Sequence, residues 1–254
     1  MKKGMNVTRT DEIEIAVPPW IADLPRDARG FVVPAEAGWE HGLPVLSQVH
    51  EARKSALGLH RRCAVCGYTM PAGRPVYRAF GQADAATIRG EQREFVLEPS
   101  GPLHLSCIVY SAMVCPWLSQ KNARISKDGQ FGAGLRRGTL AAVLGFTNYG
   151  LVLPPREHWP GGRIPAPLFG FIELVEDIRY REAADLADRY AAAVEADSSF
   201  IDLGETPMFW DADDDGLLGL VRQNADVLQA LVAREPDAGV QGHGSGGLLA
   251  VYDM

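Results

Sequence analysis

The chain has 254 residues, of which 46% are hydrophobic and 22% are charged, values typical of a folded globular protein with one large or two small domains. Its formal net charge of −7 argues against a general nucleic-acid binder, because such proteins gain most of their affinity from basic residues on phosphates. No apolar run approaches the length of about eighteen residues that a membrane span needs, so no membrane partner is expected.

Residues 1–46 predict an extended, proline-rich arm. X-Pro steps such as Leu24-Pro25 and Val33-Pro34 favour extended backbone, and one short strand is expected at Glu12–Val17. Aromatic side chains, among them Trp20 and Trp39, indicate that this arm lies across a folded surface.

Residues 47–120 predict a compact module that contains two metal-ligand half-sites. Its first helix is expected to begin at Ser47 as the N-cap, with Glu51 in the first turn. Glycines separate two short strand-like runs between the half-sites, which predicts a hairpin there. The expected elements are a helix from Ser47 to His60, strands at Val76–Phe80 and Arg93–Leu97, a turn of helix at Ala83–Ile88 and a helix over His104–Ser119.

The two half-sites are Cys63-Ala-Val-Cys66 and His104-Leu-Ser-Cys107. They supply a Cys₃His set, which matches a closed tetrahedral zinc site. His104 and Cys107 are three residues apart on the first turn of the expected helix, so their side chains share one face. Gly67 suits the tight turn of a metal-binding knuckle. A knuckle, a hairpin and a ligand pair at a helix start together predict a treble-clef-like module with a structural Zn²⁺.

Cys115 is the fourth cysteine, eight residues beyond Cys107 and too far along the helix to bind the same ion. Its apolar neighbours predict a free thiol that packs in the core. With three of four cysteines in metal-like spacing and no apolar run after Met1-Lys2-Lys3-Gly4, we expect a cytoplasmic protein without disulfides.

Residues 121–138 are polar and glycine-rich, which predicts a linker or mobile loop before an α+β region over residues 139–254. This region is expected to form a small antiparallel sheet with packed helices. Its expected elements are buried strands over Leu140–Leu153, a strand at Phe169–Ile178, helices at Tyr180–Asp197 and Gly216–Arg234, and a final strand at Leu248–Tyr252.

Asp211, Asp213 and Asp215, followed by Gly216, match the opening of a calcium-binding loop. The position of the bidentate glutamate is held by Arg222, which would repel the ion. An acidic helix start, in which carboxylates cap free N–H groups, is the favoured interpretation, and weak Ca²⁺ binding is the alternative.

Several of these segments resemble a family of uncharacterised actinobacterial and phage-associated proteins. The shared features are a Leu-Pro…Gly…Pro segment, a Cys-x-x-Cys-Gly knuckle, a Pro-x-His-x-x-Cys element and a Cys-Pro-aromatic-Leu ending. In this chain they are Leu24 to Pro34, Cys63 to Gly67, Pro102 to Cys107 and Cys115 to Leu118. The resemblance covers residues 18–119 best. It implies zinc binding and a compact first half, and it implies no activity.

Three functions are compatible with these features. The first is a non-enzymatic adaptor that recognises a protein partner, favoured by the closed ligand set and the absence of catalytic motifs. The second is an enzyme whose site lies in the C-terminal half, near Trp159, Trp210 and the acids of 211–215, with zinc purely structural. The third is a nucleic-acid binder, which would use basic residues that flank the zinc module: Arg53, Lys54, Arg61, Arg62, Lys121, Arg124, Lys127, Arg136 and Arg137.

Overall fold

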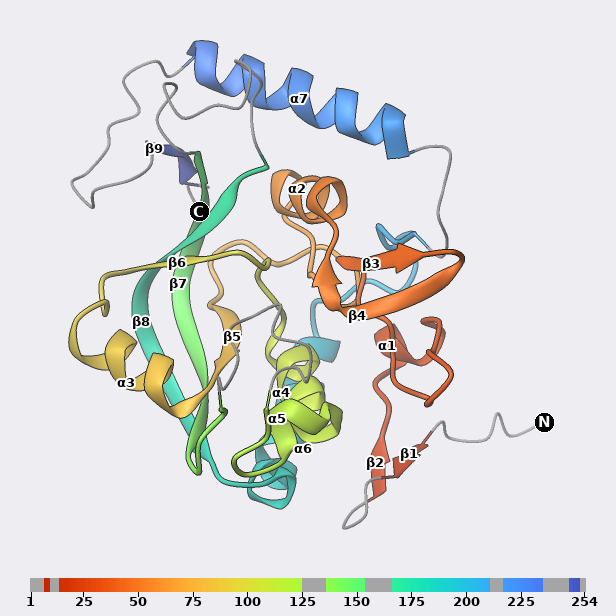
Figure 1. The fold of residues 1–254 in the computed structure, drawn as a ribbon, viewed down its shortest axis with the longest axis vertical. Coiled ribbons are helices and arrows are strands. Elements are labelled where there is room, and N and C mark those ends of the chain that lie inside the picture. Colours follow the sequence, from red (N-terminus) through yellow and green to blue (C-terminus); the bar gives the residue numbers. More distant parts are fainter. Residues whose placement is uncertain are drawn as a thin grey trace.

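A computed structural model describes residues 7–9, 14–124, 136–153, 166–210, 217–234 and 247–251. The chain forms a mixed fold of helices and antiparallel sheets, as the predicted α+β class requires. Its largest sheet has five strands, in the order β5-β7-β8-β6, with β9 paired to β7 (Figure 1). These strands are β5 (Val76–Phe80), β6 (Phe95–Glu98), β7 (Ala141–Leu153), β8 (Leu168–Tyr180) and β9 (Gly247–Val251).

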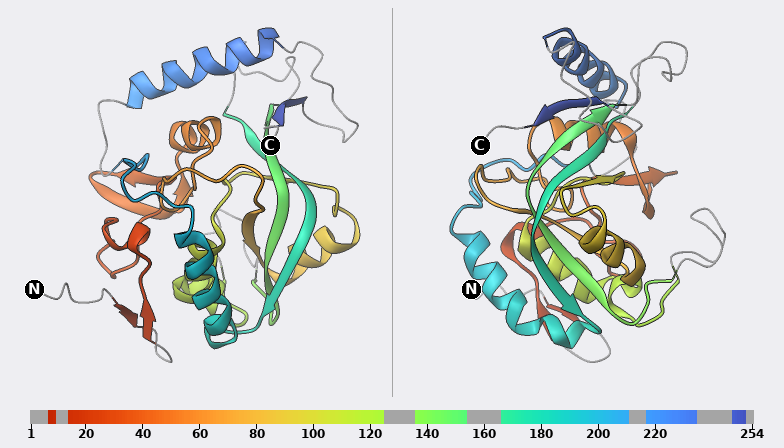
Figure 2. Two further views of the ribbon diagram at one scale, coloured as in Figure 1. Left: turned by 180° about the vertical axis from the view of Figure 1, so that it is seen from behind. Right: turned by 90° about the vertical axis from the view of Figure 1, so that its left-hand side faces the viewer.

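Strand β7 forms the centre of the sheet. The apolar run that contains it was expected to be broken by glycines, but it forms one continuous strand with a register shift between Gly145 and Phe146. Both faces of β7 are buried, apart from the half-buried Thr147. Figures 1 and 2 show α3 (Gln82–Gly90) on one side of the sheet and α4 (Leu105–Val114) with α6 (Ala187–Ser198) on the other. Because helices cover both faces of the sheet, the sequence of β7 does not alternate between apolar and polar residues.

The hairpin expected between the half-sites is not formed by its two strands. β5 pairs with β7 and β6 pairs with β8, so both long strands lie between them. The treble-clef arrangement is therefore not confirmed. Both long strands come from the region beyond residue 139, and the sheet therefore joins that region to the segment that carries the half-sites.

Residues 14–46 contain more regular structure than the one strand expected at Glu12–Val17. Strands β1 (Val7–Arg9) and β2 (Glu14–Ala16) pair with each other, α1 (Pro19–Ala22) follows, and β3 (Ala37–Glu40) pairs with β4 (Leu43–Val49). Ile21 and Val33 are fully buried, so this segment contributes to the core. Apolar residues between the prolines explain the difference, because their burial favours packing over an extended path.

Helix α2 (Glu51–Leu59) begins three residues later than predicted, because the expected N-cap Ser47 lies in β4. His50 caps it instead, and its Nδ1 accepts a hydrogen bond from the N–H of Arg53 at 3.4 Å. Tyr180 likewise ends β8 rather than opening a helix. A capping box between Glu182 and Asp185 starts the 3₁₀ helix η3 (Ala183–Leu186), and α6 follows directly.

The remaining described elements are α5 (Pro116–Ser119) and α7 (Leu217–Arg234). In Figure 1, α7 crosses α2, where Asn224 Nδ2 donates to the carbonyl of Ala52 at 2.8 Å. Within the described residues, no helix is both long and apolar enough to span a bilayer. The two described ends of the predicted linker pair with each other, since Asn122 N–H donates to Gly138 and Arg137 N–H donates to Ala123, both at 3.0 Å.

Candidate metal centre

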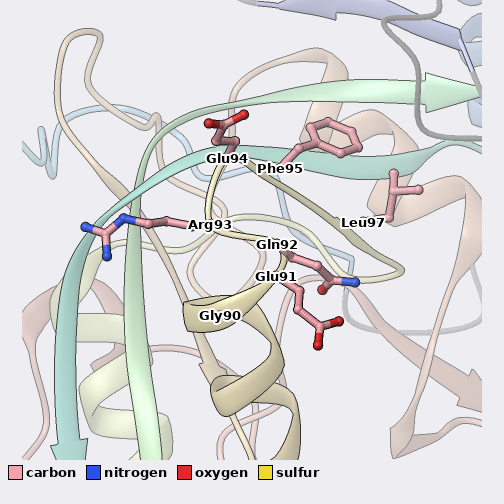
Figure 3. Close-up of a pocket in the computed structure, with 7 residues that line it drawn as sticks. All are labelled: Gly90, Glu91, Gln92, Arg93, Glu94, Phe95 and Leu97. Carbon is pink, nitrogen blue, oxygen red and sulfur yellow. The ribbon is translucent and has the colours of Figure 1, made fainter.

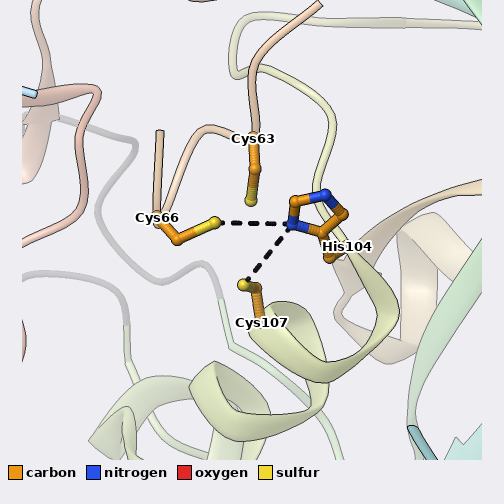
Figure 4. A group of neighbouring side chains, drawn as sticks. All are labelled: Cys63, Cys66, His104 and Cys107. Atoms are coloured by element: carbon orange, nitrogen blue, oxygen red, sulfur yellow. Dashed lines mark hydrogen bonds between the residues drawn. The ribbon is translucent and has the colours of Figure 1, made fainter. Parts of the chain in front are cut away.

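The four predicted ligands meet at one point between the knuckle and the start of α4 (Figure 4). Their ligand atoms all lie within 4.8 Å of one another, and all four residues are buried. Cys63 and Cys66 come from the knuckle that follows α2, His104 is the N-cap residue of α4, and Cys107 lies on its first turn. This cluster could hold a metal ion.

The spacing of the ligand atoms matches a small tetrahedral ion. His104 Nδ1 lies 3.4 Å from Cys66 Sγ and 3.9 Å from Cys107 Sγ. A tetrahedron with Zn–S bonds of about 2.3 Å and a Zn–N bond of about 2.0 Å places sulfur and nitrogen roughly 3.6 Å apart. The same Nδ1 atom therefore faces both sulfurs at the separation that a shared ion requires.

The knuckle turns sharply because Gly67 adopts a φ of 71°, in the left-handed region that glycine reaches without strain. Its N–H donates to the carbonyl of Cys63, and the N–H of Cys63 donates to Tyr68, both at 2.9 Å. These bonds fold the backbone back on itself so that both sulfurs point the same way. The predicted role of Gly67 in the turn agrees with this geometry.

The orientation of His104 is fixed from the opposite side of its ring. Its Nε2 lies 3.0 Å from the carbonyl of Thr69, which accepts a hydrogen bond when that nitrogen carries the proton. In the neutral imidazole, which is the form that binds a metal, Nδ1 is then the unprotonated nitrogen and faces the sulfurs. Because the His104 ring faces the sulfurs and Thr69, its side chain makes no hydrogen bond to the free N–H groups of α4. Asp197 of α6 caps the helix in its place, and the Asp197 Oδ2 atom accepts a hydrogen bond from the N–H of Ser106 at 2.7 Å.

The segment before β3 holds the two half-sites together. The N–H groups of Ala35 and Glu36 donate to Val65 and Ala64 of the knuckle at 3.0 and 3.1 Å. The Glu36 carboxylate accepts from the N–H of Gly101 at 2.9 Å, in the strand-like segment that leads to His104. Glu36 thereby bonds to the first half-site and to the segment just before the second, although it supplies no ligand.

Burial and mutual contact shift the protonation of the cluster. Burial raises the pKa of Cys66 to about 11. Burial also opposes ionisation of Cys63, but hydrogen bonds from Cys107 and Cys66 and the nearby His104 outweigh it and hold the Cys63 pKa well below its usual value. A metal ion binds thiolates, so metal binding would release the protons that the cluster carries.

The other predicted sites have different outcomes. Cys115 is half-buried, packs against the core and lies outside the cluster, in agreement with a free thiol. The candidate calcium ligands Asp211, Asp213 and Asp215 lie outside the described residues, as does Trp159.

The basic residues of the nucleic-acid alternative are divided between the core and the surface. Arg53 and Arg137 are fully buried, with the Arg137 guanidinium over the ring of Tyr180 at 4.8 Å. Lys54 is also buried, and the surrounding pairs are Lys54 with Glu51 at 2.8 Å, Arg62 with Glu205 at 2.6 Å and Lys121 with Glu182 at 2.6 Å. Arg61 lies over Tyr149 at 5.4 Å. Lys127 is outside the described residues. Burial of Arg53, Lys54 and Arg137 requires local partners, whereas Lys121, Arg124 and Arg136 are exposed.

A hollow of about 460 Å³ lies between the end of α3 and β6 (Figure 3). Glu91, Arg93 and Glu94 line it, and Figure 3 shows their charged ends pointing in different directions. Phe95 and Leu97 supply its apolar wall. Convergent polar groups, the usual mark of a catalytic or ligand pocket, are not present in this hollow.

Sequence reasoning missed one segment around the metal centre. Residues 199–208 follow α6 and cover the knuckle and His104, and we call them the strap. They contain no ligand-type spacing, and their contacts depend on residues about a hundred positions away, so no local signal marks them. No family model, curated protein or solved structure matches the chain.

Proposed function

We propose that Cys63, Cys66, His104 and Cys107 bind one structural Zn²⁺. The observation that carries this proposal is the closeness of the four ligand atoms, all within 4.8 Å and all buried. A tetrahedral set of three sulfurs and one nitrogen is typical of zinc, with iron–sulfur chemistry as the main competitor for such sites. The hydrogen bond between His104 and Thr69 adds the outer support that such ligands require.

A structural role is supported by the number and burial of the ligands. A catalytic zinc keeps one position for water or substrate, whereas four protein ligands fill a tetrahedral ion completely. The most exposed of the four residues, His104, is only 2% accessible. The ion would therefore cross-link the knuckle and the start of α4.

Elemental analysis of the purified chain tests this assignment. We expect about one zinc ion per chain, and loss of that zinc in Cys107→Ser, because one missing ligand opens the site. Cys115→Ser is the matched control, since Cys115 is the cysteine outside the cluster, and it should keep its zinc. Full zinc in both Cys107→Ser and Cys66→Ser would show that the ligand assignment is wrong.

We further propose that the protein is a non-enzymatic adaptor that recognises a protein partner. The burial of Arg53, Lys54 and Arg137 removes three of the basic residues that the nucleic-acid alternative would use, and the net charge of −7 disfavours it further. An enzyme site in the C-terminal half stays a prediction, because Trp159 and residues 211–215 lie outside the described residues. The β3–β4 hairpin supports partner binding: Leu43 at its turn is 67% exposed, and Figure 1 shows the hairpin beside α1 and away from the large sheet.

Affinity purification from the native cells tests the adaptor proposal. We expect a protein to be retained in near-stoichiometric amount by the wild type and lost with Leu43→Glu, because a buried charge opposes an apolar contact. Val175→Glu is the control, since Val175 is also exposed, at 48%, but lies on β8. Equal retention by all three proteins, or by none of them, would contradict a partner site at the hairpin.

A further inference from the structure

The strap contacts the metal centre at several points without supplying a ligand. The ring of Phe200 lies 6.0 Å from the ring of His104, and Ile201 is buried beside it. Further along, Glu205 and Met208 hydrogen-bond to residues of the knuckle. Between these contacts, Asp202, Leu203 and Gly204 are exposed.

Glu205 holds the residue that orients His104. Its Oε1 accepts a hydrogen bond from Thr69 Oγ1 at 2.8 Å, and its Oε2 accepts from the N–H of Thr69 at 3.4 Å. Thr69 in turn offers its carbonyl to Nε2 of His104 at 3.0 Å. Arg62, next to Cys63, pairs with the same carboxylate at 2.6 Å. Glu205 thus connects the residue before the first ligand with the carbonyl that fixes the histidine.

Met208 lies directly against the turn of the knuckle. Its N–H donates to the carbonyl of Gly67 at 2.9 Å. A Cβ atom placed on Gly67 would overlap the carbonyl of Met208. The glycine is therefore needed twice, once for the positive φ of the turn and once for this close approach of the strap.

We infer that the strap retains the metal ion, with Glu205 as the positioning residue that acts on His104 through Thr69. This inference rests on the proposed zinc site. The ligands are buried under protein, so an ion can leave only if part of that cover opens. The strap forms no helix or strand and exposes Asp202, Leu203 and Gly204, and such segments open locally at low free-energy cost. Its opening frees the Thr69 carbonyl and with it the ring of His104.

The test measures zinc release from the full-length, zinc-loaded chain into excess chelator. We expect Glu205→Ala to release zinc on the order of ten times faster than the wild type, in the range found when outer-shell partners of ligands are removed. Glu205→Gln keeps a carbonyl oxygen as acceptor and should restore part of the retention. Leu203→Ala is the matched control, because this exposed strap residue should release zinc at the wild-type rate.

A spectrum separates positioning from a general loss of stability. With Co²⁺ in place of zinc, Glu205→Ala should shift the d–d absorption, because the imidazole is no longer held in one orientation. If Glu205→Ala does not fold, Thr69→Ala removes the 2.8 Å bond from an exposed position and should change release and spectrum in the same direction.

The outcomes distinguish this inference from the proposed zinc site. A wild-type chain without zinc overturns both. A wild-type chain with zinc, together with unchanged release and an unchanged Co²⁺ spectrum in both Glu205→Ala and Thr69→Ala, overturns the strap inference and leaves the zinc site standing.

Discussion

The position of His104 suits two roles, capping of α4 and contact with the cysteine sulfurs, and one side chain cannot fill both. His104 occupies the N-cap position of α4, where a side chain ordinarily accepts a hydrogen bond from the first turn. Its ring instead faces Cys66 and Cys107, so the N–H of Ser106 needs another acceptor. Asp197 supplies it from α6, at the cost of placing a carboxylate in a buried position, where burial raises the Asp197 pKa although Ser106 and His104 lower it in part.

Replacing Asp197 should therefore destabilise the chain through the cap. Asp197→Ala leaves the buried N–H of Ser106 without its acceptor and should lower the free energy of unfolding by about 1–2 kcal/mol. Asp197→Asn keeps a side-chain oxygen and should lose less. Urea unfolding of the zinc-loaded proteins compares them, and equal stability of the wild type and the alanine variant would rule out a capping role.

At the scale of elements, the positions of the strands were predicted better than their pairing. The strand at Val76–Phe80 was predicted with its observed bounds, and β6 lies within one or two residues of its prediction. The prediction that these two strands pair as a hairpin was wrong. β7 and β8, which have thirteen residues each, pair with each other along most of their length and lie between β5 and β6. Strand propensity describes a pleated, half-buried segment and does not say which neighbour covers it.

Helix boundaries followed local chemistry where that chemistry was strong. The helix expected over His104–Ser119 is divided at Pro116, since α4 ends at Val114 and α5 begins at Pro116. Ser47 was a weaker signal, because a serine that favours a helix start is also accepted in a strand with a partner. Pairing of β4 with β3 decided its conformation, and the helix start moved to the cap provided by His50.

At the scale of the molecule, one continuous core includes residues of the knuckle, α4 and the large sheet. Cys63, Cys107, Val143 and Phe171 belong to this core although they are spread over more than a hundred positions. β5, which lies between the half-sites, pairs with β7. Loss of the proposed zinc would therefore disturb the sheet as well as the knuckle.

Chelation should accordingly destabilise the whole chain in one step. Because the binding free energy of a structural zinc is largely folding free energy, we expect a loss on the order of 10 kcal/mol and a large fall in Tm. Far-UV circular dichroism and tryptophan fluorescence, followed while a chelator removes the zinc, should report coincident transitions. Two separated transitions, with the sheet surviving loss of the metal, would show that the knuckle folds independently.

The four candidate ligands, the knuckle glycine and the location of most strands could be predicted from the sequence. These features depend on spacing within a few residues, and local geometry is enough to bring such residues to one face or one turn. Tertiary structure alone decided the pairing of β5 and β6 with the long strands, the burial of Arg137, the cap from Asp197 and the position of the strap over Gly67. Each of these depends on contacts between distant segments, which form because burying apolar surface and satisfying buried N–H groups is favourable only once those segments meet.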